Sequence, residues 1–90
     1  MSDSGWSVEV LDAALRQLER LDSPVTDRVT SKLAWLADHA AAVDHVPLHR
    51  DLAGFYKLRV GDWRVIYEVD PARRMLMVHA VKHRREAYRD

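Results

Sequence analysis

The chain has 90 residues, enough for one domain with a single modest hydrophobic core. With 48% apolar and 31% charged residues, it has the composition of a folded globular protein and not of a disordered one. It contains no cysteine, which excludes disulfides and thiolate metal sites, and no apolar run approaches membrane-spanning length. We therefore expect one cytoplasmic domain over residues 1–90 that does not associate with a membrane.

The formal net charge of zero conceals an uneven distribution of charge along the chain. Residues 1–49 contain four Lys or Arg and eight Asp or Glu, a balance of −4, whereas residues 50–90 contain ten and six, a balance of +4. The positive charge therefore lies in the C-terminal half, which favours a polyanion as the ligand of that half.

The N-terminal residues predict a short strand followed by a helix. Apolar and polar residues alternate over 6–10, as in a strand with one buried face. Over 11–21 the apolar residues recur at helical spacing and predict about three turns with one apolar stripe. That stripe consists of Leu11, Ala14, Leu15, Leu18 and Leu21.

A second helix is predicted from Pro24 to about Ala41. Asp22 and Ser23 form the joint before it, with Ser23 as the candidate cap and Pro24 suited to the first helical position. The apolar residues of its inner side are Val25, Val29, Leu33, Leu36 and Ala40. We expect the two helices to run antiparallel against a sheet.

Residues 42–54 show no convincing periodicity and are predicted to form a loop. Three histidines, His39, His45 and His49, lie in or beside this segment. Their spacing does not define a metal site, so we expect solvated side chains and no bound metal.

The runs Phe55 to Val60 and Trp63 to Val69 are joined by two residues, Gly61 and Asp62. A two-residue link with glycine first suits a type II′ hairpin. If Val60 pairs with Trp63, Arg59 lies opposite Arg64 and each strand keeps one apolar face, made of Tyr56, Leu58, Val60, Trp63, Val65 and Tyr67.

The other face of this hairpin is expected to be cationic, with Lys57, Arg59 and Arg64. Directly opposed like charges cost up to about 1 kcal/mol in a sheet, and an anionic ligand would remove that cost. From the pattern alone, these residues could also be no more than the solvated face of the sheet.

After a polar turn over 70–74, Met75 to Val81 predicts a central strand covered on one side by helices. His79 interrupts this apolar run and is expected to be a partly buried structural residue. Residues 82–90 follow, and four of them are Lys or Arg.

The succession GFYKLRVGDWRVIYEVD, a further apolar strand and then VKHRREAYR resembles the RelE/ParE superfamily of bacterial toxins, and the RelE branch in particular. The resemblance covers nearly the whole chain. It implies a small α+β fold related to microbial ribonucleases, with an N-terminal strand, a two-helix hairpin and three antiparallel strands in a twisted sheet. RelE-like toxins cut mRNA in the ribosomal A site, and a cognate antitoxin neutralises them.

The resemblance also implies site residues. Lys57 and Arg59 match basic residues on the strand before the hairpin, and Arg64 matches the arginine after the aromatic residue. Arg84 or Arg85 corresponds to the basic residue after the last strand, and Tyr88 to the terminal tyrosine. Phe55 departs from the pattern, since some active members have a second lysine there.

These residues suit metal-free RNA cleavage, in which the ribose 2′-hydroxyl attacks the adjacent phosphate. Arg59 and Arg64 can clamp the phosphate oxygens bidentately. Lys57 is the candidate for proton transfer, and His83 is the alternative because imidazole titrates near neutrality. The predicted catalytic set is Lys57, Arg59, Arg64, Arg84 and Tyr88, with Lys82, His83 and Arg85 as RNA-binding residues and no cofactor.

The implied partners are a RelB-like antitoxin, the ribosome and mRNA, with operator DNA as a potential further partner through the antitoxin. Two other functions stay open. One is a ParE-like inhibitor of DNA gyrase, and the other is a catalytically degenerate module that binds only its antitoxin or DNA. Trp35, outside the main helical stripe, is expected at the core rim or in an antitoxin contact.

Overall fold

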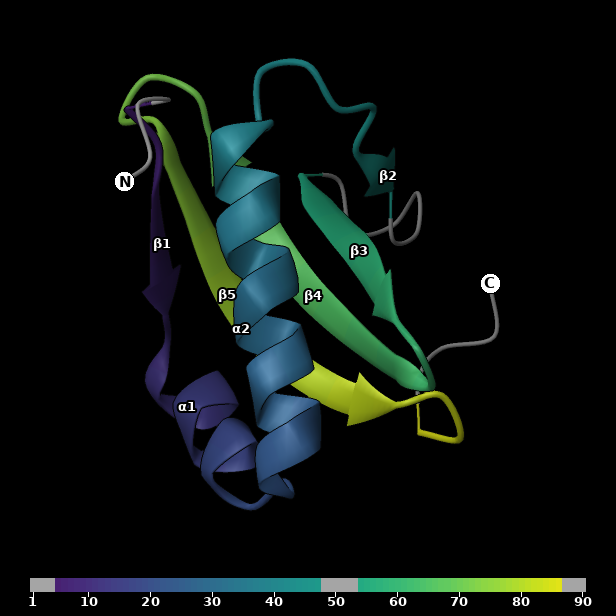
Figure 1. The fold of residues 1–90 in the computed structure, drawn as a ribbon. Helices are drawn as coiled ribbons and strands as arrows, with labels where there is room; N and C mark the ends of the chain where they lie inside the picture. Colours follow the sequence, from purple (N-terminus) through teal and green to yellow (C-terminus); the bar gives the residue numbers. More distant parts are fainter. Residues whose placement is uncertain (1–4, 48–53, 87–90) are drawn as a thin grey trace.

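The computed structural model describes residues 5–47 and 54–86 (Figure 1). The described residues form one strand, then two helices, then four strands. The elements are β1 (Ser7–Val10), α1 (Asp12–Glu19), α2 (Ser23–Asp38), β2 (Val46–Pro47), β3 (Phe55–Val60), β4 (Trp63–Asp70) and β5 (Met75–His83). No helix in these ranges is long and apolar enough to cross a membrane.

The strands form one sheet in the order β1-β5-β4-β3-β2, in which β1 is parallel to β5 and the other pairs are antiparallel. Both helices lie on one face of this sheet (Figure 1). The predicted α+β class, the order of elements and the central place of the last strand are thereby confirmed. The short strand β2 lies within the predicted loop, where Val46 and Pro47 pair with Lys57 and Tyr56.

The β3–β4 hairpin has the predicted register, with Val60 opposite Trp63 and Arg59 opposite Arg64. Gly61 has a φ of 58°, and Asp62 is not among the described residues with positive φ. This combination fits a type II′ turn, which needs positive φ only at its first central position.

The core lies between the helices and the sheet. Its buried side chains are Ala14, Leu18, Val29, Leu33, Leu36, Ala37, Ala40, Val60, Val65, Tyr67, Leu76, Val78 and Val81. Each large apolar side chain contributes about 1.5–3 kcal/mol to folding through its removal from water. Two expectations about the helices were wrong: Leu15 is 45% exposed, and Asp22, not Ser23, is the N-cap of α2.

His45 differs from the predicted solvated histidine. Its Nδ1 accepts a hydrogen bond from the Tyr67 hydroxyl at 2.6 Å, and its Nε2 donates to the Ala40 carbonyl at 2.9 Å. Because a carbonyl only accepts, Nε2 carries the proton. His45 therefore holds the segment after α2 against the core, whereas His39 is exposed as expected and His49 lies outside the described residues.

Strand β5 contains a bulge that changes which side chains face the core. Ile66 pairs with Ala80 and Tyr67 with Val78, so His79 is the extra residue. Val78 and Val81 both face the core, while His79 contacts Phe55 and Glu68 away from it. The bulge thus turns His79 onto the sheet face that the helices do not cover.

Candidate nucleic-acid interface

We call the sheet face turned away from α1 and α2 the outer face. Arg59, Arg64 and Lys82 are register partners across β3, β4 and β5. The residue next to each of them in its strand, Val60, Val65 or Val81, belongs to the core, and side chains alternate along a strand. Arg59, Arg64 and Lys82 therefore line up across the outer face at its hairpin end, and we call them the cationic row.

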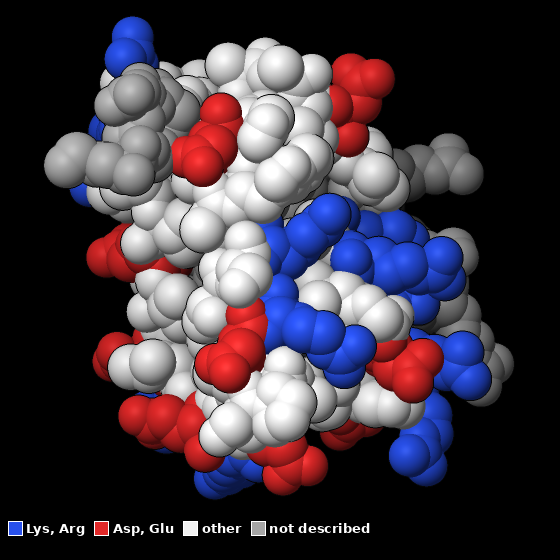
Figure 2. Space-filling view, viewed as in Figure 1, with Lys and Arg blue, Asp and Glu red and all other residues white. Residues whose placement is uncertain are grey.

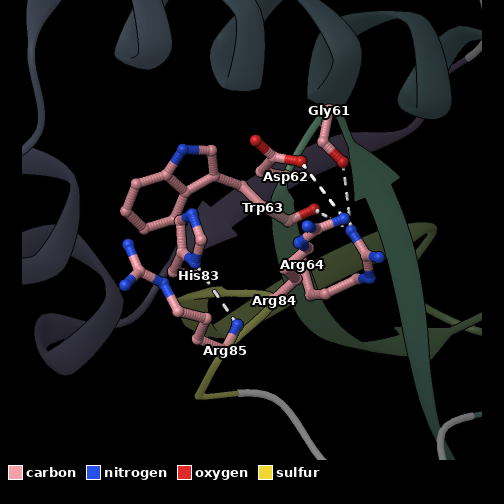
Figure 3. A network of polar contacts seen from close by, with 7 residues as sticks. All are labelled: Gly61, Asp62, Trp63, Arg64, His83, Arg84 and Arg85. Carbon is pink, nitrogen blue, oxygen red and sulfur yellow. Dashed lines mark hydrogen bonds and ion pairs between the residues drawn. The ribbon is translucent and has the colours of Figure 1, made fainter.

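The side chain of Arg64 is held in place by the hairpin itself. Its Nη1 donates to the carbonyl oxygens of Gly61 at 3.1 Å and Trp63 at 3.0 Å (Figure 3). Among the described residues, its Nε and Nη2 have no hydrogen-bond partner. A guanidinium fixed in this way presents its remaining N–H groups to an anion with little further loss of side-chain freedom.

The turn after β5 is tied to the same hairpin. The Arg84 amide donates to the Asp62 carbonyl at 2.7 Å, and the Glu86 amide donates to the His83 carbonyl at 2.8 Å. The Arg84 guanidinium lies 3.8 Å from the Asp62 carboxylate, but both side chains are about two-thirds exposed, so this ion pair adds little stability. The main-chain bond therefore places Arg84 beside the cationic row, whereas the Arg85 side chain lies on the side of Trp63 and His83 (Figure 3).

His83 is not brought to the cationic row. It pairs with Trp63, whose ring packs against the core, and the two rings meet edge to face at 5.1 Å. Its Nδ1 accepts a hydrogen bond from the Arg85 amide at 3.3 Å (Figure 3). The predicted RNA-binding residue His83 thus points to the opposite face of the sheet from Lys82. The predicted catalytic residue Tyr88 lies outside the described residues.

Lys57 lies on the outer face in the next row away from the hairpin turn, beside Ile66 and Ala80. One row further, the His79 Nε2 donates to the Glu68 carboxylate at 2.9 Å. The His79 ring also meets the Phe55 ring edge to face at 4.9 Å. The outer face therefore carries cations at one end and a histidine–carboxylate pair at the other, with Lys57 between them.

The basic surface continues from Arg59 of the cationic row to α2. Arg28 and Lys32 of α2 and Arg59 of β3 line an open groove of about 550 Å³, and Figure 2 shows Lys and Arg side chains gathered beside α2. Trp35, 42% exposed, lines the same groove under the Lys32 ammonium, which is 4.4 Å from the ring centroid. The sequence analysis did not predict that the basic surface extends to α2, although the spacing of residues 28, 32 and 35 puts them on one helix face.

The described titratable groups include one clear pKa shift. Burial, and to a lesser extent the neighbouring Tyr56, raises the pKa of Tyr67 to about 12. Tyr67 is therefore a neutral hydroxyl that donates to His45, and it belongs to the core. No cluster of three or more His, Asp or Glu that could hold a metal occurs in the described ranges.

Residues 8–88 match the family described as the ParE toxin of the type II toxin–antitoxin system parDE. The chain belongs to this family of toxins. The match covers nearly all of the chain and confirms the resemblance to the RelE/ParE superfamily. No curated protein matches the chain.

Several solved toxin structures have the same fold. A chain of the RelBE2 toxin–antitoxin complex from Mycobacterium tuberculosis is 26% identical, with a TM-score of 0.77, covering 88% of this chain and 91% of that one. The isolated RelE toxin of E. coli is 20% identical with a TM-score of 0.73, covering 94% and 87%. A chain of the archaeal RelE–RelB complex from Pyrococcus horikoshii is 19% identical with a TM-score of 0.71, covering 92% and 99%.

Proposed function

We propose that this toxin is a ribosome-dependent endoribonuclease that cuts translated mRNA in the A site. The observation that carries the proposal is the cationic row, together with Arg84 tied to the hairpin turn. Three aligned cations on the sheet face away from the helices repel one another, and an extended polyanion on that face would relieve the repulsion. The likeness to RelE structures adds support for RNA as the polyanion.

The proposed reaction needs no metal. The ribose 2′-oxygen attacks the adjacent phosphorus, the bond to the 5′-oxygen breaks, and the products carry a 2′,3′-cyclic phosphate and a 5′-hydroxyl. Arg59 and Arg64 would stabilise the phosphorane charge, and Arg84 and Arg85 would hold the neighbouring backbone. Tyr88, on which a base could stack, completes the proposed site. Contacts to phosphate carry no sequence information, so the ribosome would supply the positioning.

We further propose a RelB-like antitoxin as the partner that neutralises the toxin. The RelBE2 and archaeal RelE–RelB structures are toxin–antitoxin complexes. An acidic and apolar antitoxin segment would complement the basic outer face or the groove beside α2, where Trp35 offers apolar surface next to Arg28 and Lys32. Operator DNA would be reached through that antitoxin.

A second candidate function is inhibition of DNA gyrase. It is favoured by the family match, which is to the ParE toxin of parDE. A gyrase inhibitor would cause DNA breaks and an SOS response while leaving mRNA intact. The two candidates therefore differ in the nucleic acid that is broken in the cell.

The test is mapping of mRNA 5′-ends after a short pulse of expression in the cytoplasm of a bacterial host. We expect new ends inside translated codons with the wild type and at least a tenfold loss of them with Arg64→Ala, because the hairpin-held guanidinium is removed. Arg73→Ala is the matched control, since Arg73 is an exposed arginine in the turn between β4 and β5, at the other end of the sheet. Growth arrest with DNA breaks and unchanged mRNA ends would instead identify a gyrase inhibitor.

A further inference from the structure

The pair formed by His79 and Glu68 has no assigned role in the proposed reaction. Both side chains lie on the outer face, and they are 32% and 40% exposed. The Nε2–Oε1 distance of 2.9 Å is that of a well-formed charge-assisted hydrogen bond. The pair lies on the same sheet face as the cationic row and is accessible to a ligand bound there.

The hydrogen bond decides which nitrogen of His79 can act as a base. A carboxylate only accepts, so Nε2 of the imidazole carries the proton that Glu68 receives. In the neutral ring, Nδ1 then holds the free lone pair. Among the described residues, Nδ1 has no hydrogen-bond partner, which leaves it able to take a proton from a ligand.

The bulge and Phe55 hold His79 in this position. His79 is the extra residue of the bulge between Val78 and Ala80, and its side chain points outward. Bulges often aim a side chain at an active site. The Phe55 ring packs edge to face on the imidazole at 4.9 Å, with the rings inclined by 70°. Phe55 stands where some RelE-like toxins have a second lysine, so here that position supports a histidine from the opposite side of β4.

Distances along the strands make the arrangement compatible with one RNA strand. Successive outward residues of a strand lie roughly 7 Å apart, so His79 is about one row from Lys57 and two from the cationic row. The long side chains of Lys57 and Arg59 can reach toward His79, whereas the Arg64 guanidinium, held at the hairpin, would contact the RNA strand further along. His83, the other histidine near the cations, faces the core side against Trp63 and is less suited to this role.

We propose that His79 is the general base of the cleavage reaction and that Glu68 positions it; this inference rests on the proposed endoribonuclease function. His79 Nδ1 takes the proton of the 2′-hydroxyl, and the 2′-oxygen forms a bond to phosphorus. The bond from phosphorus to the 5′-oxygen breaks, and that oxygen leaves with a proton from the Lys57 ammonium. The imidazolium then returns its proton to Lys57 through solvent.

This assignment makes Lys57 the proton donor of the reaction and not the base. A protonated amine can donate to the leaving oxygen and stabilise the phosphorane charge. The charged groups that face the His79 region are Glu68 on β4, Lys57 on β3, Lys82 on β5 and Glu9, whose β1 position pairs with Met77. Because the imidazole acts as a base, the reaction rate is expected to depend on pH.

The experiment is single-turnover cleavage of mRNA on programmed ribosomes at saturating toxin, measured between pH 6 and pH 8.5. We expect His79→Gln to lower the rate at least 100-fold, and Glu68→Gln to lower it about tenfold and move the pH midpoint. Sedimentation with ribosomes should be unchanged for both variants. His39→Gln is the matched control, because His39 lies exposed at the end of α2.

A second variant separates chemistry from folding. In His79→Ala, added imidazole should restore at least a tenth of the lost rate, which a purely structural role of His79 would not allow. Wild-type rates and pH profile in His79→Gln, or a loss that imidazole does not restore, would overturn the inference alone. Absence of cleavage by the wild type on ribosomes would overturn the proposed function and this inference with it.

Discussion

Tyr67 and His45 show how one pair of side chains joins the irregular part of the chain to the core. Tyr67 is 1% exposed, and its hydroxyl donates to His45, which in turn donates to the Ala40 carbonyl. A buried hydroxyl without a partner would cost about 1–3 kcal/mol, so the pair stabilises both the core and the segment after α2. Burial also keeps the phenol neutral well into the alkaline range.

The raised pKa of Tyr67 predicts a loss of stability at alkaline pH. The pKa is about 12 in the folded protein against 10.0 as the reference, so between pH 10 and 12 the unfolded chain loses this proton while the folded one keeps it. The free energy of unfolding should therefore fall by about 2–3 kcal/mol from this residue over that range. Urea unfolding of wild type and Tyr67→Phe at a series of pH values measures it.

In Tyr67→Phe the decrease of about 2–3 kcal/mol in the free energy of unfolding between pH 10 and 12 should disappear. The variant should nevertheless be about 1–3 kcal/mol less stable than the wild type at pH 8, because His45 Nδ1 loses its hydrogen-bond donor. Tyr56→Phe is the control and should retain most of the fall, since burial is the larger cause of the shift. Equal losses in wild type and Tyr67→Phe between pH 10 and 12 would refute the explanation.

At the scale of elements, α1 supplies a hydrogen-bond acceptor to the edge of β5 beyond the point where β1 ends. Strand β1 pairs with β5 only as far as Val78, and the Leu11 amide then donates to the Val78 carbonyl. The next available amide along that edge, Val81 N, donates to the Gln17 side-chain oxygen at 2.7 Å. One side chain of α1 thus takes the place of a strand and links the helix to β5.

Removal of this link should destabilise the fold without changing its topology. Gln17→Ala leaves the Val81 amide without its acceptor, and we expect the free energy of unfolding to fall by about 1–3 kcal/mol. Gln17→Glu keeps an oxygen at the same place and should lose less than half as much. The urea midpoints of the three proteins measure the effect, and a wild-type midpoint for Gln17→Ala would show that solvent or a shifted side chain replaces the bond.

The hairpin could be predicted from the sequence because two local signals agree. Gly61 first in a two-residue link selects the turn, and this turn sets the register that places Tyr56, Leu58, Val60, Trp63, Val65 and Tyr67 on one apolar face. The cationic row follows from that register once β5 is added. These features depend on residues close together in the chain.

The bulge in β5 and the contacts that depend on it could not be predicted. The run Val78-His79-Ala80-Val81 has small or apolar residues around His79, so the pattern does not show which residue is extra. The pairing of His79 with Glu68, the bond from Val81 to Gln17 and the groove beside Arg28 all join distant parts of the chain. Periodicity carries no signal for contacts of this kind.

At the scale of the whole molecule, basic residues from both halves of the chain gather at the hairpin end. The C-terminal half supplies the cationic row and the turn with Arg84 and Arg85, while Arg28 and Lys32 from the acidic half join them at the hairpin end (Figure 2). A molecule with zero net charge thus has one basic end, which is suited to a polyanion. That end, and not the overall charge, would orient the toxin on the ribosome.

The measurement that tests the central claim most directly is cleavage of defined mRNA on purified ribosomes, with one ribose of the A-site codon replaced by 2′-deoxyribose. We predict that the all-ribose mRNA is cut within that codon to give a 2′,3′-cyclic phosphate and a 5′-hydroxyl. The bond that follows the 2′-deoxy nucleotide should remain intact, because its attacking oxygen is missing. Equal cleavage of both mRNAs, or of neither, would contradict the proposed reaction.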